Sequence, residues 1–342
     1  MSDLKQRVLV IRFSALGDVV MTVPVLQAFL SANPDIEIIM LSDARLSELF
    51  RGIDRLIFVG ADLKNKHKGI RGIYRLFKEL KKSYHFHQVA DLHGVIRSHI
   101  LRLLFRLSKK TTAVIDKGRF EKFALVRKEH KIYRPLKHST ERYLEVFKQL
   151  GYKNTGTSEL AKQNINVTAY ESEVINKKIN IGFAPFAKHL PKMYPLDRFI
   201  EVIRHFDQEN YALYFFGGGP VEMAFIKEWE NKFKNAIAFD HQMGLQDELL
   251  LMSKMQVMVT MDSANMHLAC LAKVPVVSIW GPTHPHAGFY GLGQDPQHAM
   301  QVSLACRPCS VFGNKACWRG DHACMNQIEP KVIIEKILQV VG

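Results

Sequence analysis

The sequence predicts an α/β protein with two similar, doubly wound domains, each built on a parallel sheet. Three observations lead to this fold class. Short apolar runs alternate with helical patterns along the first half, as in β-α-β units whose helices cover both faces of a sheet. The alternation fades over residues 155–178, and it then begins again. With 342 residues, 47% of them hydrophobic, the chain is long enough for two separate cores.

The first predicted domain, residues 1–165, begins with a buried strand followed by a helix. Residues 8–13 are rich in β-branched side chains, and apolar residues follow with helical spacing from about 19 to 30. Further strands are predicted at 36–41, 56–59, 88–92 and 112–115. The stretches 97–110 and 119–131 have the spacing of amphipathic helices with basic outer faces. This half therefore predicts an α/β domain with a cationic surface.

The second predicted domain, residues 166–342, repeats the same rhythm. Its strands are predicted at 180–184, 212–216, 236–239, 257–260 and 274–279. In doubly wound sheets, ligands bind outside the carboxyl ends of the strands, and the polar and Gly-rich turns of this sequence fall there. We therefore expect a cleft between the two halves. The pattern leaves open whether the final helix packs back on the first domain.

Charge is distributed unevenly along the chain. Residues 1–175 contain 31 basic and 18 acidic side chains, whereas residues 176–342 contain 16 and 15. An anionic partner is therefore expected at the first half. The overall charge of +14 would by itself fit a nucleic-acid-binding protein. No basic recognition helix or aromatic RNA-binding motif supports that class, so no nucleic-acid partner is expected.

The sequence contains no segment that reads as a membrane span or a signal peptide. The most apolar N-terminal stretch, residues 8–30, is interrupted by Arg12 and Asp18 and contains Pro24. We therefore expect a cytoplasmic protein.

The first turn of the chain offers a candidate general base. Residues 13–18 lead directly from a strand into a helix, and Gly17 permits close approach of a ligand to the backbone. Asp18 could be a helix cap, or it could remove a proton from a substrate hydroxyl at the carboxyl edge of the sheet. The turn is not a G-x-G-x-x-G, so a dinucleotide site is poorly supported.

Three later turns have the residues of an anion site. Lys188 and Lys192 lie in a loop between a strand and a helix, where a lysine can neutralise a phosphate leaving group. Glycines 217–219 precede Glu222, which could accept hydrogen bonds from ribose hydroxyls. Asp262 and Ser263 stand where a strand gives way to a helix, with His267 one turn later.

Five motifs together resemble the heptosyltransferases of bacterial lipopolysaccharide assembly, which are glycosyltransferases of family 9. They are R-x-S-A-L-G-D at 12–18, D-L-H-G-x-x-R-S at 91–98, K-x-aromatic-P at 192–195, D-S-x-x-M-H-L-A at 262–269 and G-P-T-x-P at 281–285. The resemblance extends over nearly the whole chain. It implies GT-B architecture, with two Rossmann-like domains that face each other across a cleft.

The resemblance also implies the roles of individual residues, with Asp18 as the catalytic base. The nucleotide-sugar site is implied at Lys192, Glu222, Asp262, Ser263, His267, Gly281 and Thr283. The acceptor site is implied at Arg12, Ser14, His93 and Arg97. The sequence departs from the family pattern at Phe186, Tyr194 and Ala264, all in the donor half.

The expected function is that of an inverting, metal-independent glycosyltransferase. The implied donor is ADP-heptose, and the implied acceptor is a phosphorylated, lipid-linked glycan of the lipopolysaccharide core. An alternative is a transferase of the same fold that uses another nucleotide sugar for a different surface glycan. The basic half favours peripheral association with the anionic inner face of the inner membrane. The basic residues expected at that membrane surface are Arg102, Arg106, Lys109 and Lys110.

Four cysteines cluster near the C-terminus in a C-x₂-C-x₇-C-x₆-C pattern. They are Cys306, Cys309, Cys317 and Cys324. Four thiolates can hold a structural zinc ion, but the spacing of the second pair is looser than in a zinc ribbon. Reduced thiols that pack a loop are the favoured interpretation, and no cofactor is expected to be required.

Overall fold

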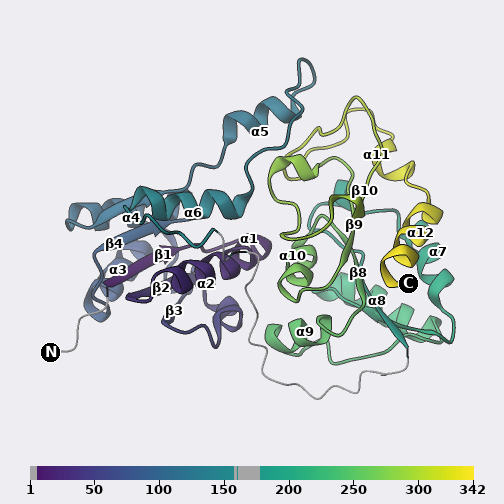
Figure 1. The fold of residues 1–342 in the computed structure, drawn as a ribbon, viewed down its shortest axis with the longest axis horizontal. Coiled ribbons are helices and arrows are strands. Elements are labelled where there is room, and N and C mark those ends of the chain that lie inside the picture. Colours follow the sequence, from purple (N-terminus) through teal and green to yellow (C-terminus); the bar gives the residue numbers. More distant parts are fainter. Residues whose placement is uncertain (1–5, 158–159, 161–177) are drawn as a thin grey trace. The chain divides into compact units, whose positions relative to one another are not determined.

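The computed structural model describes residues 6–157, residue 160 and residues 178–342. The chain divides into two compact units, each an open, wholly parallel sheet with helices packed on it (Figure 1). The first unit contains residues 1–117 and 137–166, and the second contains residues 118–136 and 167–342. The two doubly wound α/β domains expected from the sequence are confirmed. The predicted boundary at residue 165 lies outside the described residues.

The sheet of the first unit has the strand order β3-β2-β1-β4-β5. Its strands are β1 (Gln6–Ile11), β2 (Ile36–Asp43), β3 (Leu56–Ala61), β4 (Gln88–Asp91) and β5 (Thr111–Val114). Its helices are α1 (Leu16–Val20), α2 (Thr22–Ala32), the 3₁₀ helix η1 (Ala44–Phe50), α3 (Gly69–Ser83), α4 (Ile96–Leu107) and α6 (Ser139–Gln149). All five strands overlap the predicted positions.

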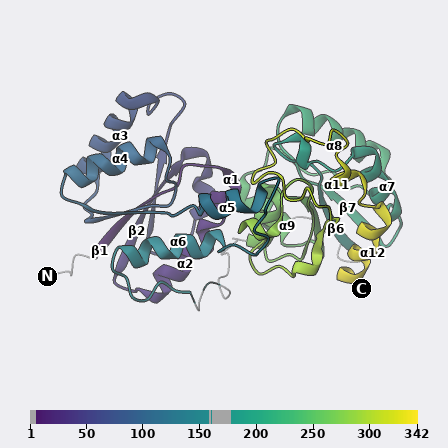
Figure 2. The same cartoon turned by 90° about the horizontal axis from the view of Figure 1, so that it is seen from above.

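Helices cover both faces of this sheet. Figure 2 shows α3 and α4 together on one face, with α2 and α6 on the other, and contacts join the helices within each pair. Central strands must therefore be apolar on both sides, which is why Val8, Leu9, Val10 and Ile11 are all fully buried. Between the sheet and the α3–α4 layer lies a core that includes Leu76, Phe77, Leu101 and Phe105.

The sheet of the second unit has the strand order β10-β9-β8-β6-β7. Its strands are β6 (Ile179–Ala184), β7 (Tyr211–Phe215), β8 (Val257–Met261), β9 (Val276–Ile279) and β10 (Ala299–Met300). Its α-helices are α5 (Arg119–Val126), α7 (Leu196–Phe206), α8 (Pro220–Lys232), α9 (Leu245–Met252), α10 (Ala264–Leu271), α11 (Ala323–Asn326) and α12 (Pro330–Val341). Its 3₁₀ helices are η3 (Leu190–Lys192), η4 (Pro285–Ala287) and η5 (Pro296–His298). The last helix, α12, packs on α7 and on strands β8 and β9 of its own unit.

One strand prediction in this unit is wrong. Residues 236–239 form no strand, because only Ala236 makes a bridge, to Leu213 of β7. The apolar character that suggested a strand comes from side-chain packing, since the Phe239 ring lies against Phe216 and Tyr214. The edge strand next to β9 is β10, which the sequence did not predict. It has only two residues, too few for a recognisable strand pattern.

The segment 118–136 belongs to the second unit, although it lies within the predicted first domain. The Lys131 ammonium donates to the carbonyl oxygens of Ala305, Cys306 and Pro308 at 3.2, 2.6 and 3.0 Å. The backbone N–H of Leu136 donates to the carbonyl of His286 at 2.9 Å. Lys131 thus attaches the segment 118–136 to the loop at 305–308. Because its ammonium group is hydrogen-bonded there, Lys131 is not needed to bind an anionic partner.

Candidate functional site

In the first unit, the turns after β1 and β4 meet at the carboxyl edge of the sheet. The two strands are parallel neighbours, and Ile11 is in register with Asp91. The residues that follow them are therefore adjacent, so the Arg12 guanidinium donates to the carbonyl of Leu92 at 2.7 Å. Parallel pairing thereby brings two motifs that are about 80 residues apart in sequence into one site.

Asp18 lies on this buried guanidinium. An Nη2 atom of Arg12 is 2.6 Å from Oδ2 of Asp18, and only 7% of the Arg12 side chain is exposed, against 40% for Asp18. The same Oδ2 accepts the backbone N–H of Ala15 at 3.3 Å, so the helix-cap role considered from the sequence is also present. Asp18 is thus held by a charged partner on its buried side while it remains accessible to a substrate.

Tyr143 of α6 completes the enclosure of Arg12. The guanidinium lies 5.7 Å from the centre of the buried Tyr143 ring, a cation–π distance, and the Tyr143 hydroxyl donates to the Asp18 carbonyl at 3.3 Å. Burial alone lowers the pKa of Arg12, but Tyr143 and Asp18 outweigh burial and raise that pKa above its usual value. The guanidinium therefore stays charged in a site from which water is largely excluded.

His93 closes the turn after β4. Oδ1 of the fully buried Asp91 accepts the backbone N–H groups of His93 and Gly94 at 3.0 and 2.8 Å. Nδ1 of His93 in turn accepts the N–H of Phe13 at 3.3 Å. Burial, assisted by the charges of Arg12 and Lys117, lowers the pKa of His93 to about 3. His93 is therefore neutral near pH 7 and orients the turn that contains Arg12.

The four residues implied for the acceptor site are not all brought together. Arg12 and His93 are buried beside Asp18, where each supports the turn. Ser14 lies exposed in the turn itself, and Arg97 lies exposed in the first turn of α4. Of the four, Ser14 and Arg97 are thus the ones whose side chains can reach a ligand.

The second unit gathers its polar turns at the corresponding edge of its own sheet. β6, β8 and β9 are neighbours, with Ala184 in register with Thr260, and Met261 in register with Ile279. The residues beyond these strand ends include Lys192, Asp262 and Gly281. Nζ of Lys192 lies 2.8 Å from Oδ2 of Asp262, and the two side chains are only 13% and 6% exposed. This pair forms the charged centre of the edge.

Two hydroxyl groups in the turns after β8 and β9 are buried without a hydrogen-bond partner among the described residues. They belong to Ser263, which caps α10, and to Thr283 in the turn after β9. A buried hydroxyl without a partner costs free energy, so these two groups are candidates for hydrogen bonds to a ligand. His267 is buried one turn inside α10.

Glu222 belongs to the glycine turn after β7. Its Oε2 accepts the backbone N–H of Gly218 at 2.8 Å, and Gly219 adopts φ +89°, a conformation that glycine tolerates best. Pro220 then begins α8. The carboxylate thus fixes the turn, and no contact between Glu222 and the Lys192–Asp262 pair is found in the described part of the chain.

The loop that contains Lys192 is fixed by residues far along the chain. The hydroxyl of the buried Tyr194 donates to the carbonyl of Ile328 at 2.6 Å. Gly313, at φ +71°, packs directly on the lysine stem, because a β-carbon there would lie 2.2 Å from Cγ of Lys192.

The turn after β9 is also held by a distant residue. The buried Arg307 guanidinium donates to the carbonyls of Gly281 and Thr283 at 2.5 and 3.1 Å. Sequence reasoning missed Gly313 and Arg307 because these contacts join distant segments.

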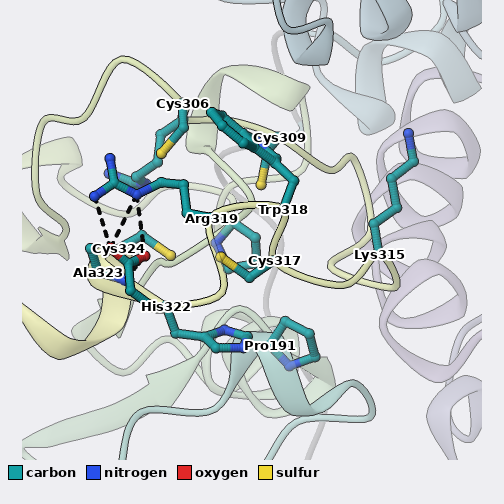
Figure 3. A pocket seen from close by; sticks show the side chains of 13 residues that line it. Pro191, Cys306, Cys309, Lys315, Cys317, Trp318, Arg319, His322, Ala323 and Cys324 are labelled. Atoms are coloured by element: carbon teal, nitrogen blue, oxygen red, sulfur yellow. Dashed lines mark hydrogen bonds and ion pairs between the residues drawn. The ribbon is translucent and has the colours of Figure 1, made fainter.

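The four clustered cysteines line one pocket of the second unit, together with Trp318, Arg319 and His322 (Figure 3). All are free thiols. Burial raises the pKa of the Cys324 thiol to about 11, and burial and the neighbouring thiols raise that of Cys309. Within the described residues, no group of three or more His, Cys, Asp or Glu side chains is arranged to hold a metal ion.

Comparison with known proteins identifies the family. The model of glycosyltransferase family 9 (heptosyltransferase) matches residues 73–316, which is more than half of the chain. The chain belongs to glycosyltransferase family 9. This confirms the resemblance drawn from the five motifs, and with it an enzyme that transfers a sugar. Lipooligosaccharide heptosyltransferase 2 of Campylobacter jejuni is 26% identical over 337 residues, which cover 94% of this chain and 95% of that protein.

Solved structures of other family 9 proteins share the fold. The family 9 glycosyltransferase of Veillonella parvula superposes with a TM-score of 0.76 at 21% identity, covering 100% of this chain and 98% of that one. The heptosyltransferase WaaC of E. coli, solved with ADP, gives a TM-score of 0.66 at 19% identity, covering 98% and 100%. The two Rossmann-like domains that the GT-B resemblance implies are thereby confirmed.

The contact between Gly313 and Lys192 predicts a binding defect in this family 9 enzyme. Gly313→Ala forces the lysine stem to move, and if Lys192 binds a nucleoside diphosphate, as the family resemblance implies, the loss of that charged contact weakens its binding about tenfold. Gly320→Ala is the matched control, since Gly320 has a similar φ of +81° but no atom within 4 Å of its added β-carbon. Calorimetry on both variants is the measurement, and equal affinities would contradict the contact.

Proposed function

We propose that this enzyme transfers heptose from ADP-heptose to a lipid-linked acceptor of the lipopolysaccharide or lipooligosaccharide core. The proposal rests on relatives that match along nearly their whole length, including lipopolysaccharide heptosyltransferase 1 of Pseudomonas aeruginosa, at 24% identity over 316 residues. The observation on which the chemistry depends is a carboxylate, Asp18, that is accessible to substrate and bound to a buried arginine.

In this proposal Asp18 is the general base. Its carboxylate takes the proton of the acceptor hydroxyl as that oxygen attacks the anomeric carbon. The bond between the anomeric carbon and the nucleotide diphosphate breaks on the opposite face, and the diphosphate leaves with the electron pair. The configuration at the anomeric carbon is therefore inverted. Arg12 holds Oδ2 of Asp18 in place.

The second unit would bind the donor and stabilise the leaving group. Negative charge grows on the diphosphate as the bond breaks, and Lys192 and the N-terminus of α10 offer positive charge and free N–H groups. The unpartnered hydroxyls of Ser263 and Thr283 supply further donors. Glu222 would accept hydrogen bonds from the ribose hydroxyls. Gly281 would lie beside the nucleotide, and it packs closely on Met325, since a β-carbon at position 281 would lie 2.7 Å from that side chain.

We further propose that transfer needs no metal ion and that the four-cysteine pocket holds reduced thiols. The charge on the leaving group would be met by protein groups alone, so a chelator should leave the rate unchanged. Metal analysis of the freshly purified protein should find no stoichiometric metal, and thiol titration after denaturation should find five thiols. One metal ion per chain that is lost in Cys306→Ser with Cys309→Ser would contradict this.

We place the enzyme at the inner face of the inner membrane, where its lipid-linked acceptor would be found. No helix in the described part of the chain is long and apolar enough to cross a bilayer. Association would therefore be peripheral and would depend on the basic residues of the first half. No nucleic-acid partner is proposed.

The donor and acceptor are tested together by product mass. The purified enzyme is incubated with a panel of nucleotide sugars and with core acceptors that lack or contain the first heptose. We expect a mass increase of one heptose from ADP-heptose. A product formed only from another nucleotide sugar would overturn the proposed donor and leave the glycosyltransferase fold and site intact.

The role of Asp18 predicts a specific kinetic defect. Asp18→Asn should lower the transfer rate by about 10²-fold or more, the usual contribution of a general base, while ADP affinity is unchanged. Asp54→Asn, at an exposed position of the same unit, is the control and should keep full activity. Near-normal turnover of Asp18→Asn would leave Asp18 only its role as a helix cap.

A further inference from the structure

The outer sides of α3 and α4 carry an unusual concentration of positive charge. Residues 69–83 and 96–110 contain ten lysines and arginines and a single acidic residue, Glu79. That carboxylate is already paired, since its oxygens lie 2.9 Å from Nζ of Lys66 and 3.2 Å from Nε2 of His67. The exposed basic side chains of the two helices therefore have almost no acidic neighbours of their own.

Large apolar side chains stand exposed among these charges. They are Ile70 (72% exposed), Tyr74 (47%), Ile96 (78%), Leu103 (47%) and Leu107 (74%). The inward sides of the same helices already supply Ile73, Leu76, Phe77, Leu101 and Phe105 to the core. The exposed set is thus not needed to hold the helices on the sheet. Apolar residues set among basic ones are typical of helices that lie in a membrane interface.

The two helices form one surface. α3 and α4 pack against each other on the same face of the first sheet (Figure 2). We call their outward-pointing residues the α3–α4 face: Ile70, Arg71, Tyr74, Arg75, Lys78, Ile96, Leu103, Arg106, Leu107 and Lys109. Both helices follow parallel strands, so both begin at the carboxyl edge of the sheet, where Asp18 lies.

The structure corrects the set of basic residues expected from the sequence. Arg102 turns inward, where its Nε atom lies 3.5 Å from Oδ2 of the buried Asp91. Nζ of Lys110 lies 5.6 Å from the centre of the Phe86 ring. Arg106 and Lys109 remain exposed, and the further charge comes from α3, through Arg71, Arg75 and Lys78.

We infer that the α3–α4 face is the surface by which this enzyme docks on an anionic lipid bilayer. This inference deepens the proposed function, because it rests on an acceptor that is held in the membrane. Basic side chains would lie among anionic headgroups, and the aliphatic side chains between them would enter the interface. The N-terminal ends of α3 and α4 lie at the carboxyl edge of the sheet, so docking through this face leaves the edge that carries Asp18 next to the membrane, where the saccharide of a lipid-linked acceptor emerges.

A bilayer fits this face better than a nucleic acid does. Phosphate contacts use charge alone and gain nothing from exposed isoleucine and leucine. Partition of aliphatic side chains into an interface depends on them directly. The two kinds of partner can thus be separated by substituting the apolar residues while all charges are kept.

Vesicle sedimentation of the full chain is the test. Vesicles of phosphatidylglycerol and phosphatidylcholine in equal parts are compared with pure phosphatidylcholine. We expect binding to the anionic vesicles only, weaker at high salt. Ile70→Ser with Leu107→Ser, and separately Arg71→Gln with Arg75→Gln, should each reduce binding about tenfold. The matched controls should bind like the unaltered chain: Phe120→Ser with Phe123→Ser on α5, and Lys331→Gln with Lys336→Gln on α12.

Three outcomes would overturn the inference. They are equal binding to neutral vesicles, face variants that bind like the unaltered chain, and a preference for RNA that the apolar substitutions do not change. Transfer to a water-soluble acceptor without its acyl chains separates this inference from the proposed function. The face variants should keep that activity at full rate. Absence of transfer in the unaltered enzyme would instead refute the proposed function and leave the vesicle result standing.

Discussion

The burial of the Arg12 guanidinium is the constraint on which the site of the first unit depends. Arg12 directly follows β1, so the central strand leads it into the protein, where a charge must be paired. Its partners are the Leu92 carbonyl, the Tyr143 ring and the Asp18 carboxylate, which come from three separate segments. Satisfying one buried cation thus draws the turns after β1 and β4 and helix α6 together. Of the two side chains that contact Arg12, Tyr143 is buried, whereas Asp18 remains accessible to a substrate.

The second unit holds a cation, Lys192, that in the proposed function binds the donor phosphate. Lys192 is kept in place by Asp262 on one side and by the backbone of Gly313 on the other. The hydroxyls of Ser263 and Thr283, buried without a hydrogen-bond partner among the described residues, are the groups that the proposed donor would satisfy. Both edges follow from the same rule: parallel strands deliver every following turn to one end of the sheet.

Sequence reasoning succeeded where local pattern determines structure. The apolar runs located most strands, and Asp18, Lys192 and Asp262 stood out because each follows a strand end. It failed where contacts are made across the chain. No local sequence pattern predicts the contacts of Arg307 and Gly313. The same holds for the attachment of residues 118–136 to the second unit. The false strand at 236–239 shows the converse, since aromatic residues that pack on a sheet resemble a strand in sequence. Arg102 was misjudged because its partner, Asp91, is buried beneath it.

The most direct test of this account is a double-mutant cycle between Arg12 and Asp18, with sugar transfer as the measurement. If Arg12 acts by holding the carboxylate of Asp18, then Arg12→Gln slows transfer only while Asp18 is present. Arg12→Gln with Asp18→Asn is therefore expected to be no slower than Asp18→Asn alone, with an unchanged thermal unfolding curve as the evidence of intact folding. Losses in rate that multiply in the double variant would contradict it, because Arg12 would then act on the reaction independently of Asp18.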